Sequence, residues 1–518
     1  MAPPTGSTIR TPLPSAAIVV AIVVAVVVAL GAQGPPDQTS TATQGGAFDL
    51  VLAGGRVMDP ESRLDAVRHI GIRGARIAAV SATPLKGQVT VDVAGLVVAP
   101  GFIDPHSHDQ TLEGNRFQAR DGVTTALELE SGAMPMPDWY RSREGQALLN
   151  YGATVGHIYS RIAVMHEKRS WDDIRVTRLD ASQPKPAWAY RRAAAGEVDA
   201  MITHLDRGLA EGALGIGMGP AYTPGVDREE LLRVFELAAR RKALAFIHMR
   251  SAGEVEPGGS IDALQEVLAN VAATGASVHI VHIGSMGLRR TPRLLAMIDG
   301  ARARGFDVTT EVYPYTAAST YLQSPLFDAG WQERFAIGFK DIQWSATGER
   351  LTEESFNRYR AQGGLVVIHM IPESSVRAAL VHPGVMIGSD GVPLTNGGGH
   401  PRGIGTYARV LGRYVREEKV LDLMTALSKI SLMVAQRLEP FVPAMRTKGR
   451  LKIGADADIT VFDPSRVIDR ATYEKPAQPS EGIRHVIVNG TFVVRDEQLV
   501  PSVMPGRAIR AGKPKGDR

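Results

Sequence analysis

Histidine and carboxylate side chains that can bind a metal ion follow several strand-like stretches of this sequence. His106 and His108 come directly after GFID, and Glu128 and Glu130 end GVTTALELE. Because alternate residues of a strand point to the same face, each pair presents two donor groups on one side. Single donors follow later strand-like stretches: His157 after ATVG, His248 after ALAFI, His282 after SVHIV and Asp390 after VMIGS.

Each of these residues also has an ordinary structural explanation. A lone histidine beside a strand is commonly a hydrogen-bonded core or loop residue, Asp390 in GSDG suits a turn, and either glutamate could pair with an arginine. Packing does not explain why such residues recur at successive strand ends, whereas a divalent cation does. Imidazole and carboxylate ligands without cysteine suit zinc first, with manganese, iron or cobalt as alternatives. The sequence therefore predicts a site for one or two divalent ions.

The composition limits the possible functions. The chain has 518 residues, 44% of them hydrophobic, and a net charge of only +4, so that one large globular domain and a smaller one are expected. It has no cysteine, which excludes disulfides, thiolate nucleophiles and thiolate metal ligands. The basic residues of segment 501–518 form a loose tail that we expect to be solvated, and we predict no nucleic-acid partner.

The N-terminus has the organisation of a secretory signal. One arginine in MAPPTGSTIR precedes the apolar run AAIVVAIVVAVVVAL, which small residues and a loop-like QGPPDQTSTATQGG follow. We predict that residues 1–46 are a signal peptide, or alternatively a membrane anchor, plus a linker. The protein is then exported to the periplasm or the extracellular space, with membrane contact only if this segment is uncleaved.

If these donor residues bind one site, the fold must bring the ends of their strands close together. Short strands and turns in residues 47–100 and 441–500 predict one small β-sandwich built from both ends of the chain. Between them, in residues 101–440, about eight strand–helix units predict a (β/α)8 TIM barrel, an α/β fold with its chemistry at the carboxyl ends of the strands. Residues 324–364 interrupt this rhythm and are expected to form an insertion after the seventh strand, as a lid or wall over the site.

Several motifs resemble a known family. FIDPHSH, the single histidines after the fifth and sixth strands and GSDG near the eighth resemble the metal-dependent amidohydrolase superfamily, whose members have this barrel and a split β-sandwich. A narrower resemblance, to the N-acyl-D-amino-acid deacylases, is carried by GVTT, ATVGH, EGALGIGMGPAYTPG, HMRS, YPYTAAST and GHPRGIGTYARVLG. The likeness extends from about Phe48 to Asp496.

The resemblance implies two metal positions. It assigns His106, His108 and Asp390 to one, His248 and His282 to the other, and a bridging ligand at the end of the second strand. The deacylases carry a cysteine at the bridge, where this chain has Ser131. Since neutral serine is a poor bridging ligand, we expect the anionic Glu130 beside it to bridge or bind the metal. Glu128, two residues earlier in the strand, is expected to interact with the metal ligands rather than with the metal.

Substrate recognition departs from the same pattern. The deacylases usually have a lysine two positions after the sixth-strand histidine, where this chain has Gly284. Arg402 matches their carboxylate-binding arginine, and an arginine fork suits a carboxylate. Tyr315 and Ser319 match other pocket-lining positions. Loss of the lysine calls the strictness of carboxylate recognition into question.

The resemblance implies hydrolysis of a linear amide, namely deacylation of N-acyl-D-amino acids. Asp390 is expected to accept a proton from the attacking water and to pass it to the leaving amine, while His157 or a neighbouring tyrosine stabilises the oxyanion. Alternatives are hydrolysis of cyclic amides such as hydantoins or dihydropyrimidines, a dipeptidase, a lactonase or ester hydrolase, and a metal-free scaffold. The D preference rests on the resemblance alone, and the oligomeric state is not predicted.

Overall fold

The computed structural model describes Met1 and residues 47–512. The predicted export segment, Met1 apart, and the last six residues of the basic tail lie outside the described residues. No helix in the described part of the chain combines the length and the apolar character that crossing a membrane requires.

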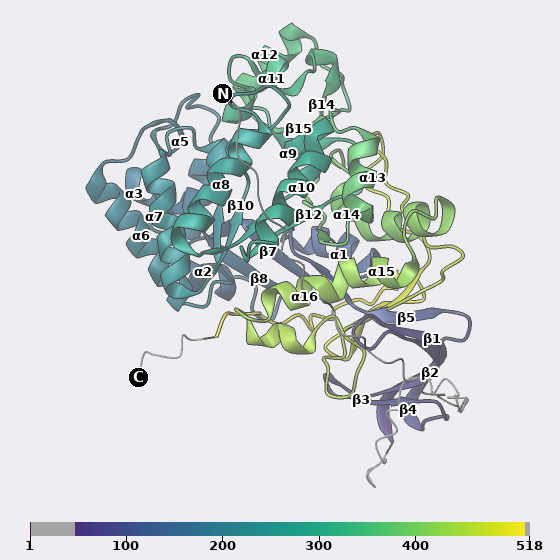
Figure 1. Ribbon diagram of the computed structural model, residues 1–518. Coiled ribbons are helices and arrows are strands. Elements are labelled where there is room, and N and C mark those ends of the chain that lie inside the picture. Colours follow the sequence, from purple (N-terminus) through teal and green to yellow (C-terminus); the bar gives the residue numbers. More distant parts are fainter. Residues whose placement is uncertain (2–46, 513–518) are drawn as a thin grey trace. The chain divides into compact units, whose positions relative to one another are not determined.

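A barrel of eight parallel strands forms the centre of the described chain (Figure 1). Hydrogen bonds connect the strands in the order β16-β12-β11-β10-β9-β8-β7-β6, and a parallel bridge from Ser107 to Gly391 spans the gap between the first and the last. The predicted TIM barrel is confirmed. Its strands are β6 (Phe102–Asp104), β7 (Val123–Ala133), β8 (Asn150–Gly156), β9 (Ile216–Met218), β10 (Leu244–Ile247), β11 (Ser277–Ile280), β12 (Val308–Val312) and β16 (Val385–Ile387).

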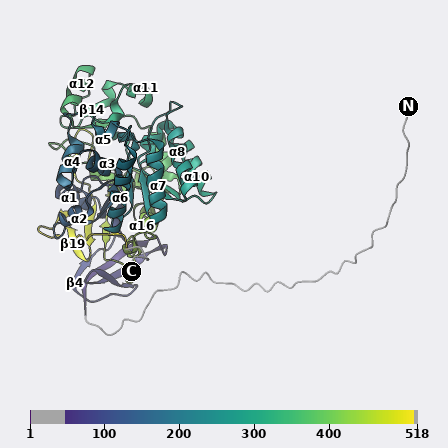
Figure 2. The same cartoon turned by 90° about the vertical axis from the view of Figure 1, so that its left-hand side faces the viewer.

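Helices pack on the outside of these strands. The amphipathic sequences DREELLRVFELAARRKA and SIDALQEVLANVAATG form α7 (Arg228–Arg241) and α8 (Ser260–Thr274), two helices of the predicted strand–helix units. Helix α7 lies between α6 (Ala195–Ala210) and α8 in Figures 1 and 2. Asp227 caps α7 by accepting a hydrogen bond from the Glu230 backbone N–H. Other helices are α1 (Leu112–Arg120), α2 (Met136–Arg141), α3 (His157–Met165), α4 (Trp171–Leu179), α5 (Ala187–Tyr190), α9 (Ile283–Gly287), α10 (Thr291–Arg302), α13 (Glu373–Val381), α14 (Arg402–Arg409), α15 (Leu423–Leu427) and α16 (Met433–Leu438).

Strands from both ends of the chain form one β domain, as the sequence predicts. Antiparallel pairing of β5 with β17 joins the two halves into a nine-stranded sheet, and apolar side chains such as Leu52, Ile70 and Ile459 form its core. The strands are β1 (Phe48–Asp59), β2 (Leu64–Arg73), β3 (Arg76–Ser81), β4 (Gly87–Asp92), β5 (Val97–Pro100), β17 (Ile459–Phe462), β18 (Ile483–Val488), β19 (Thr491–Arg495) and β20 (Gln498–Leu499).

The irregular stretch between β12 and β16 is a small subdomain with its own sheet. Strands β13 (Ala318–Tyr321), β14 (Ile342–Trp344) and β15 (Leu365–Ile368) pair antiparallel in the order β13-β15-β14. The helices α11 (Trp331–Phe335) and α12 (Glu353–Gln362) contribute to a separate apolar cluster. The subdomain therefore extends beyond the predicted limits of 324–364, because β13 and β15 belong to its sheet.

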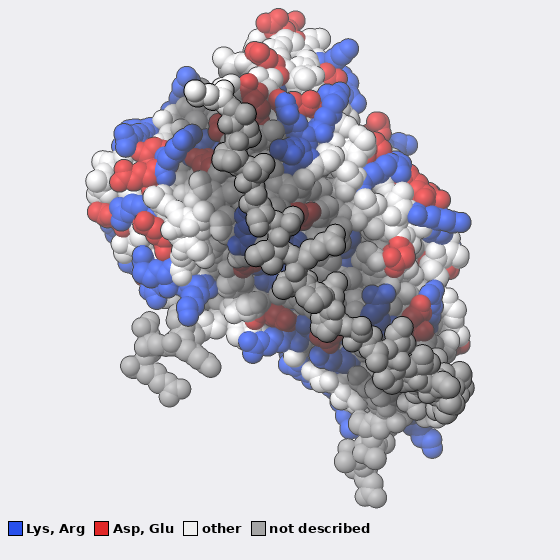
Figure 3. Space-filling model, in the orientation of Figure 1, with Lys and Arg blue, Asp and Glu red and all other residues white. Residues whose placement is uncertain are grey.

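The basic side chains of the tail that the structure describes, Arg507 and Arg510, are exposed, but the backbone of residues 506–511 docks against the barrel, which was not predicted. The Gly506 N–H donates to Ala147 O (2.9 Å), the Ile509 N–H donates to Tyr151 O (2.7 Å), and the Arg510 guanidinium lies 3.6 Å from the ring centroid of Tyr140. These partners lie more than 300 residues away in the sequence, so no local pattern indicates the docking. On the face that Figure 3 shows, positive and negative side chains are interspersed, as is typical of a solvated surface.

Candidate metal centre and active site

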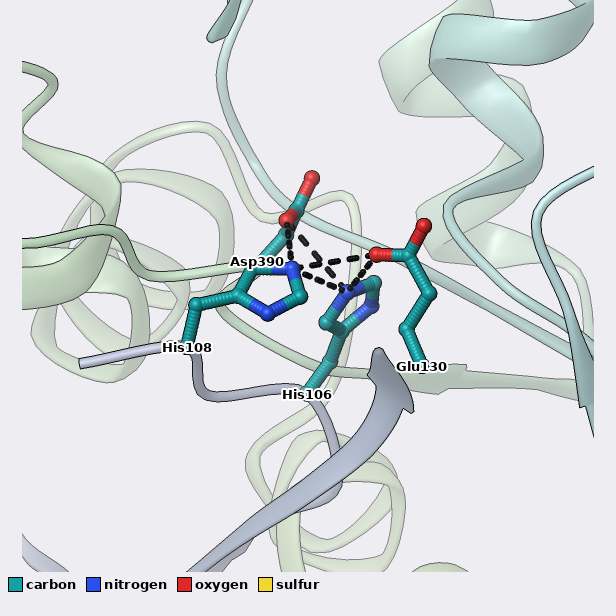
Figure 4. Close-up of side chains that lie close together, drawn as sticks. All are labelled: His106, His108, Glu130 and Asp390. Carbon is teal, nitrogen blue, oxygen red and sulfur yellow. Dashed lines mark hydrogen bonds and ion pairs between the residues drawn. The ribbon is translucent and has the colours of Figure 1, made fainter. Parts of the chain in front are cut away.

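Four predicted ligands converge where β6, β7 and β16 end. His106 Nε2 lies 2.8 Å and His108 Nε2 lies 3.0 Å from the same oxygen of Glu130, Oε2. Asp390 Oδ1 lies 3.3 Å from both ring nitrogens. Figure 4 shows the four side chains pointing to one common place. The strand ends thus bring together donors that are up to 284 residues apart (390 − 106).

A second group of ligands shares Glu130 with the first. Its other oxygen, Oε1, lies 2.7 Å from His248 Nδ1 and 3.9 Å from His282 Nε2. The three side chains are buried, and their donor atoms lie within 4.8 Å of one another, close enough to hold one ion. Glu130 therefore has one oxygen in each group, which is the arrangement of a carboxylate that bridges two ions. Ser131 faces elsewhere, since its Oγ accepts a hydrogen bond from Arg178 Nη2 (3.1 Å).

The chemistry of these donors fits a divalent metal. His106 Nε2 and His108 Nε2 lie 3.1 Å apart and both face Glu130, a crowding of lone pairs that a shared cation relieves. Burial disfavours protonation of both imidazoles, yet the surrounding carboxylates, Asp390 and Glu311 at His106 and Glu128 at His108, hold the pKa of each well above its ordinary value. The site thus attracts positive charge. Imidazole and carboxylate donors are the ligands that zinc takes in hydrolytic sites.

A buried glutamate that the sequence analysis did not single out orients the ligands. Glu311 lies in β12; its Oε1 is 2.6 Å from His106 Nδ1 and its Oε2 is 2.5 Å from His279 Nε2. The bond to Nδ1 leaves the lone pair of His106 Nε2 facing the metal position. Glu128 serves His108 in the same way, with its Oε2 2.8 Å from His108 Nδ1. A glutamate inside the buried strand sequence VTTEV was the available signal for Glu311.

Two ligands have an unusual backbone conformation. His282 (φ 32°) and Asp390 (φ 52°) both lie in the left-handed region, which side chains other than glycine rarely adopt. A hydrogen bond from the His282 N–H to Glu311 Oε1 (3.2 Å) holds the first. Such conformations cost about 1–3 kcal/mol each and concentrate at functional sites. Two of the thirteen described non-glycine residues with positive φ are therefore candidate metal ligands.

Asp390 is also paired with Arg402, the first residue of α14. Arg402 Nη1 lies 2.8 Å from Asp390 Oδ2, and its Nη2 donates to Ser319 O (3.2 Å). Burial alone would raise the pKa of Asp390, but Arg402, and then His106, outweigh it and hold the pKa well below the ordinary value. Asp390 is therefore ionised, and one of its oxygens remains directed at the histidines.

Comparison with known proteins agrees with this geometry. A family model described as "Amidohydrolase family" matches residues 89–241 and 205–494. The chain belongs to the amidohydrolase family. The resemblance expected from the motifs is thereby confirmed.

Three similar proteins are deacylases. An N-acyl-D-glutamate deacylase of Alcaligenes xylosoxydans xylosoxydans is 33% identical and the match covers 91% of this chain and 99% of the relative. A D-aminoacylase of the same organism is 30% identical, with 89% and 97% covered. The crystal structure of N-acyl-D-glutamate deacylase from Bordetella bronchiseptica, complexed with zinc and a phosphonate mimic of the tetrahedral intermediate, is 29% identical with a TM-score of 0.76 and covers 90% of this chain and 100% of that one.

The candidate metal ligands of this amidohydrolase, all except the deeper His106, line a cavity of about 550 Å³, a size typical of small-molecule sites. The barrel rim and the subdomain between β12 and β16 both contribute to its wall. Ser319 and Arg402 line it, as do two tyrosines that the sequence analysis did not identify, Tyr222 and Tyr313. Tyr222 lies against His248 with the ring centroids 4.8 Å apart.

Two predicted site residues lie elsewhere. His157 is buried beside α7, with its Nε2 2.8 Å from Glu230 Oε1, and does not line the cavity. The prediction that it stabilises the oxyanion is therefore wrong. Tyr315 also lies outside the cavity, since its hydroxyl donates to Asp469 Oδ2 (3.3 Å). Tyr315 follows Pro314 beyond the end of β12, where strand alternation no longer keeps it on the side of Tyr313.

Proposed function

We propose that this chain is a metal-dependent amide hydrolase that deacylates N-acyl-D-amino acids to a carboxylic acid and a free amino acid. One observation carries the proposal: Glu130 places one oxygen in each of two ligand groups at a cavity that also contains a buried arginine. The relatives named above act on N-acyl-D-amino acids, and one was crystallised with zinc. We propose zinc as the metal here, with up to two ions bound.

The chain's own residues supply the proton transfers. Bound zinc would supply Lewis acidity, which lowers the pKa of water and polarises the scissile carbonyl. Asp390 Oδ1 lies 3.3 Å from the Nε2 atoms of His106 and His108, and Asp390 lines the cavity without being shared between the two ligand groups as Glu130 is. It therefore accepts the proton of the attacking water. It then delivers that proton to the amine nitrogen as the C–N bond breaks. The hydroxyls of Tyr222 and Tyr313 are available in the same cavity to donate to the oxyanion.

Arg402 is the proposed partner of the substrate carboxylate. Its Nε and the Ser319 Oγ are buried and have no hydrogen-bond partner among the described residues. Unpaired buried donors are costly, and a carboxylate satisfies both at once. Arg402 and Ser319 are already held together by the bond from Arg402 Nη2 to the Ser319 carbonyl. Arg402 and Ser319 can therefore bind the substrate carboxylate without the lysine that the deacylases have at the position of Gly284.

The proposal is tested with the purified protein, stripped of metal by a chelator and then titrated with zinc. N-acetyl-D-leucine, N-acetyl-L-leucine and a 5-substituted hydantoin are assayed side by side. We expect zinc-dependent release of leucine from the D substrate and little from the L substrate. Hydrolysis of the hydantoin in preference to both would replace the proposal with cyclic amide hydrolysis.

We further propose that the protein is exported by its N-terminal segment. The support is the order of basic, apolar and small residues in positions 1–46, of which the structure describes only Met1. Expression of the full chain followed by N-terminal sequencing of the protein outside the cytoplasm tests this. We expect a new N-terminus shortly after the apolar run, whereas retention of Met1 in membranes would favour the anchor.

A further inference from the structure

Helix α4 presents two arginines to the cavity beside the metal ligands. Arg175 and Arg178 are three residues apart, so they lie on the same side of the helix, and both line the cavity. The acidic residues of α4 lie instead in its first turn, where Ser170 caps the helix. This separation leaves one wall of the cavity with a positive charge.

Arg178 is held in place by neutral groups. Its Nη1 donates to the Tyr159 hydroxyl (2.6 Å) and its Nη2 donates to Ser131 Oγ (3.1 Å). Neither partner carries a charge, and among the described residues no carboxylate lies within ion-pair distance of Arg178. Because Ser131 follows Glu130, the guanidinium lies close to the proposed bridging ligand.

A third arginine adds to this wall. Arg143 lines the cavity with its guanidinium 4.0 Å from the ring centroid of Trp139, and its buried Nε has no hydrogen-bond partner in the described chain. Burial lowers the pKa of Arg143 to about 10, and the charges of Tyr151 and Glu128 offset only part of this effect. We call Arg143, Arg175 and Arg178 the arginine wall.

The acidic groups near the arginine wall are already engaged or exposed. Glu128 has one oxygen 2.8 Å from His108 Nδ1, and the other accepts hydrogen bonds from the Ser131 and Gly132 N–H groups (3.0 and 3.3 Å). Asp180, directly after α4, also lines the cavity, but it is exposed to solvent and within ion-pair distance of none of the three arginines. Arg175 has only a distant contact with Asp172, at 3.8 Å. Arg143 and Arg178, which are partly buried, thus lack the anion that normally accompanies a buried guanidinium group, whereas Arg175 is exposed at the cavity edge.

The arginine wall and Arg402 approach the metal ligands from different parts of the barrel. Arg402 follows β16 and α4 follows β8, with at least two strands between them in either direction around the barrel. Arg402 contacts Asp390, whereas Arg178 contacts the residue after Glu130. A substrate amide at the metal ligands, with its amino-acid carboxylate at Arg402, therefore extends its acyl group toward the arginine wall.

We propose that the arginine wall binds a second substrate carboxylate, located at the far end of the acyl group. The preferred substrates are then amino acids whose nitrogen is acylated by one end of a dicarboxylic acid, as in N-succinyl amino acids. The inference rests on the proposed function. Water adds across the amide: the acyl carbon gains the hydroxyl oxygen, the C–N bond breaks and the nitrogen gains the proton. The products are a dicarboxylic acid and a free amino acid.

The test compares N-succinyl-D-leucine with N-pentanoyl-D-leucine, which has an uncharged acyl end. For the zinc-loaded full chain we expect kcat/KM to favour the succinyl compound about 10- to 100-fold, the range that charge-assisted hydrogen bonds supply. Arg178→Gln should reduce this ratio by about the same factor, and Arg178→Lys should reduce it less. Arg169→Gln is the matched control, since Arg169 is exposed just before α4 and does not line the cavity; it should leave the ratio unchanged.

Other outcomes separate the possible failures. N-acetyl-D-glutamate and N-acetyl-D-glutamine form a second pair; an Arg178-dependent preference in that pair alone would assign the second carboxylate to the amino acid and overturn the acyl assignment. Hydrolysis of all four compounds with no effect of Arg178 would overturn the inference and leave the proposed function intact. No hydrolysis of any would reject the proposed function itself. If Arg178→Gln does not fold, as judged by circular dichroism, Arg175→Gln takes its place.

Discussion

Two clusters of buried histidine and glutamate occur at strand ends of this barrel, and they do different things. In the metal cluster, defined by the ligands of both groups, carboxylates and imidazoles surround a position that no arginine or lysine of the described residues occupies. In the closed cluster, His157, Glu230 and Arg161 satisfy one another. Arg161 Nη1 lies 2.6 and 2.5 Å from the two Glu230 oxygens, and its Nε donates to the Trp188 carbonyl (2.6 Å).

The difference is the source of the positive charge. In the closed cluster the chain provides its own cation, so the carboxylate is neutralised and no ion is required. In the metal cluster the one arginine, Arg402, contacts only the outer oxygen of Asp390, and Glu130 has no arginine or lysine partner among the described residues. A histidine at a strand end therefore indicates a metal site only when the nearby carboxylates are not paired with an arginine or lysine of the same chain.

The substitution Glu130→Gln is the strongest test of this difference between the two clusters. The substitution removes the ligand that serves both groups, so we expect metal content to fall from about two equivalents per chain and activity to fall by more than about 10⁴-fold, since the metal supplies several kcal/mol. Elemental analysis and kcat/KM on the same preparation provide the measurement. Unchanged metal content would make Glu130 structural, like Glu230.

Asp390→Asn should be nearly as severe. We expect kcat to fall about 10³-fold, because asparagine cannot accept and return the proton. Single-turnover assays at saturating zinc measure the effect, with metal content determined in parallel. Near-normal turnover would remove Asp390 from the proposed role.

Glu230→Gln tests the closed cluster. It leaves Arg161 buried without a countercharge, so the free energy of unfolding should decrease by about 3–5 kcal/mol. Urea denaturation measures this loss. Metal content and kcat of the folded fraction should match the wild type, and a loss of bound metal would contradict the separation of the two clusters.

The closed cluster also predicts a pH dependence. Burial alone would raise the pKa of Glu230, but the hydrogen bond and charge of His157, together with Arg161, lower it to about 2 from an ordinary 4.5. The folded state binds fewer protons than the unfolded state between these values. This stabilisation, about 3 kcal/mol, is therefore complete above about pH 5 and is lost as the pH falls through 4.5 toward 2. The difference in unfolding free energy between wild type and Glu230→Gln should shrink over that range; a constant difference would reject the assignment.

The smallest effect is expected for Glu311→Gln, which alters a group behind the metal ligands. Zinc affinity should fall about 10- to 100-fold, because His106 loses the carboxylate that fixes its tautomer. Competition with a chromogenic chelator measures the affinity. Glu254→Gln, a control at a half-buried glutamate that contacts Arg289 and belongs to neither ligand group, should bind zinc like the wild type.

Local sequence patterns predicted most of the framework. The alternating strands and the amphipathic helices α7 and α8 depend on neighbours in the sequence, and these elements are confirmed. Docking of residues 506–511 was not predictable, because the partners Ala147 and Tyr151 lie at a distant place in the sequence. Glu311 was not predicted because a single glutamate in a strand forms no spacing pattern. Its histidine partners come close to it only in the folded barrel.

The sequence by itself determined which donors stand at the strand ends, since parallel strands joined by outer helices gather their carboxyl ends at one rim. Only the tertiary structure decided which of those donors share an ion. Arg161, one helical turn after His157, meets Glu230 from α7 and closes that cluster, while Glu130 meets histidines from three other strands with no cation among them. The physical reason is that neutralisation of buried charge depends on which groups come within a few ångströms, and packing of distant elements sets those distances.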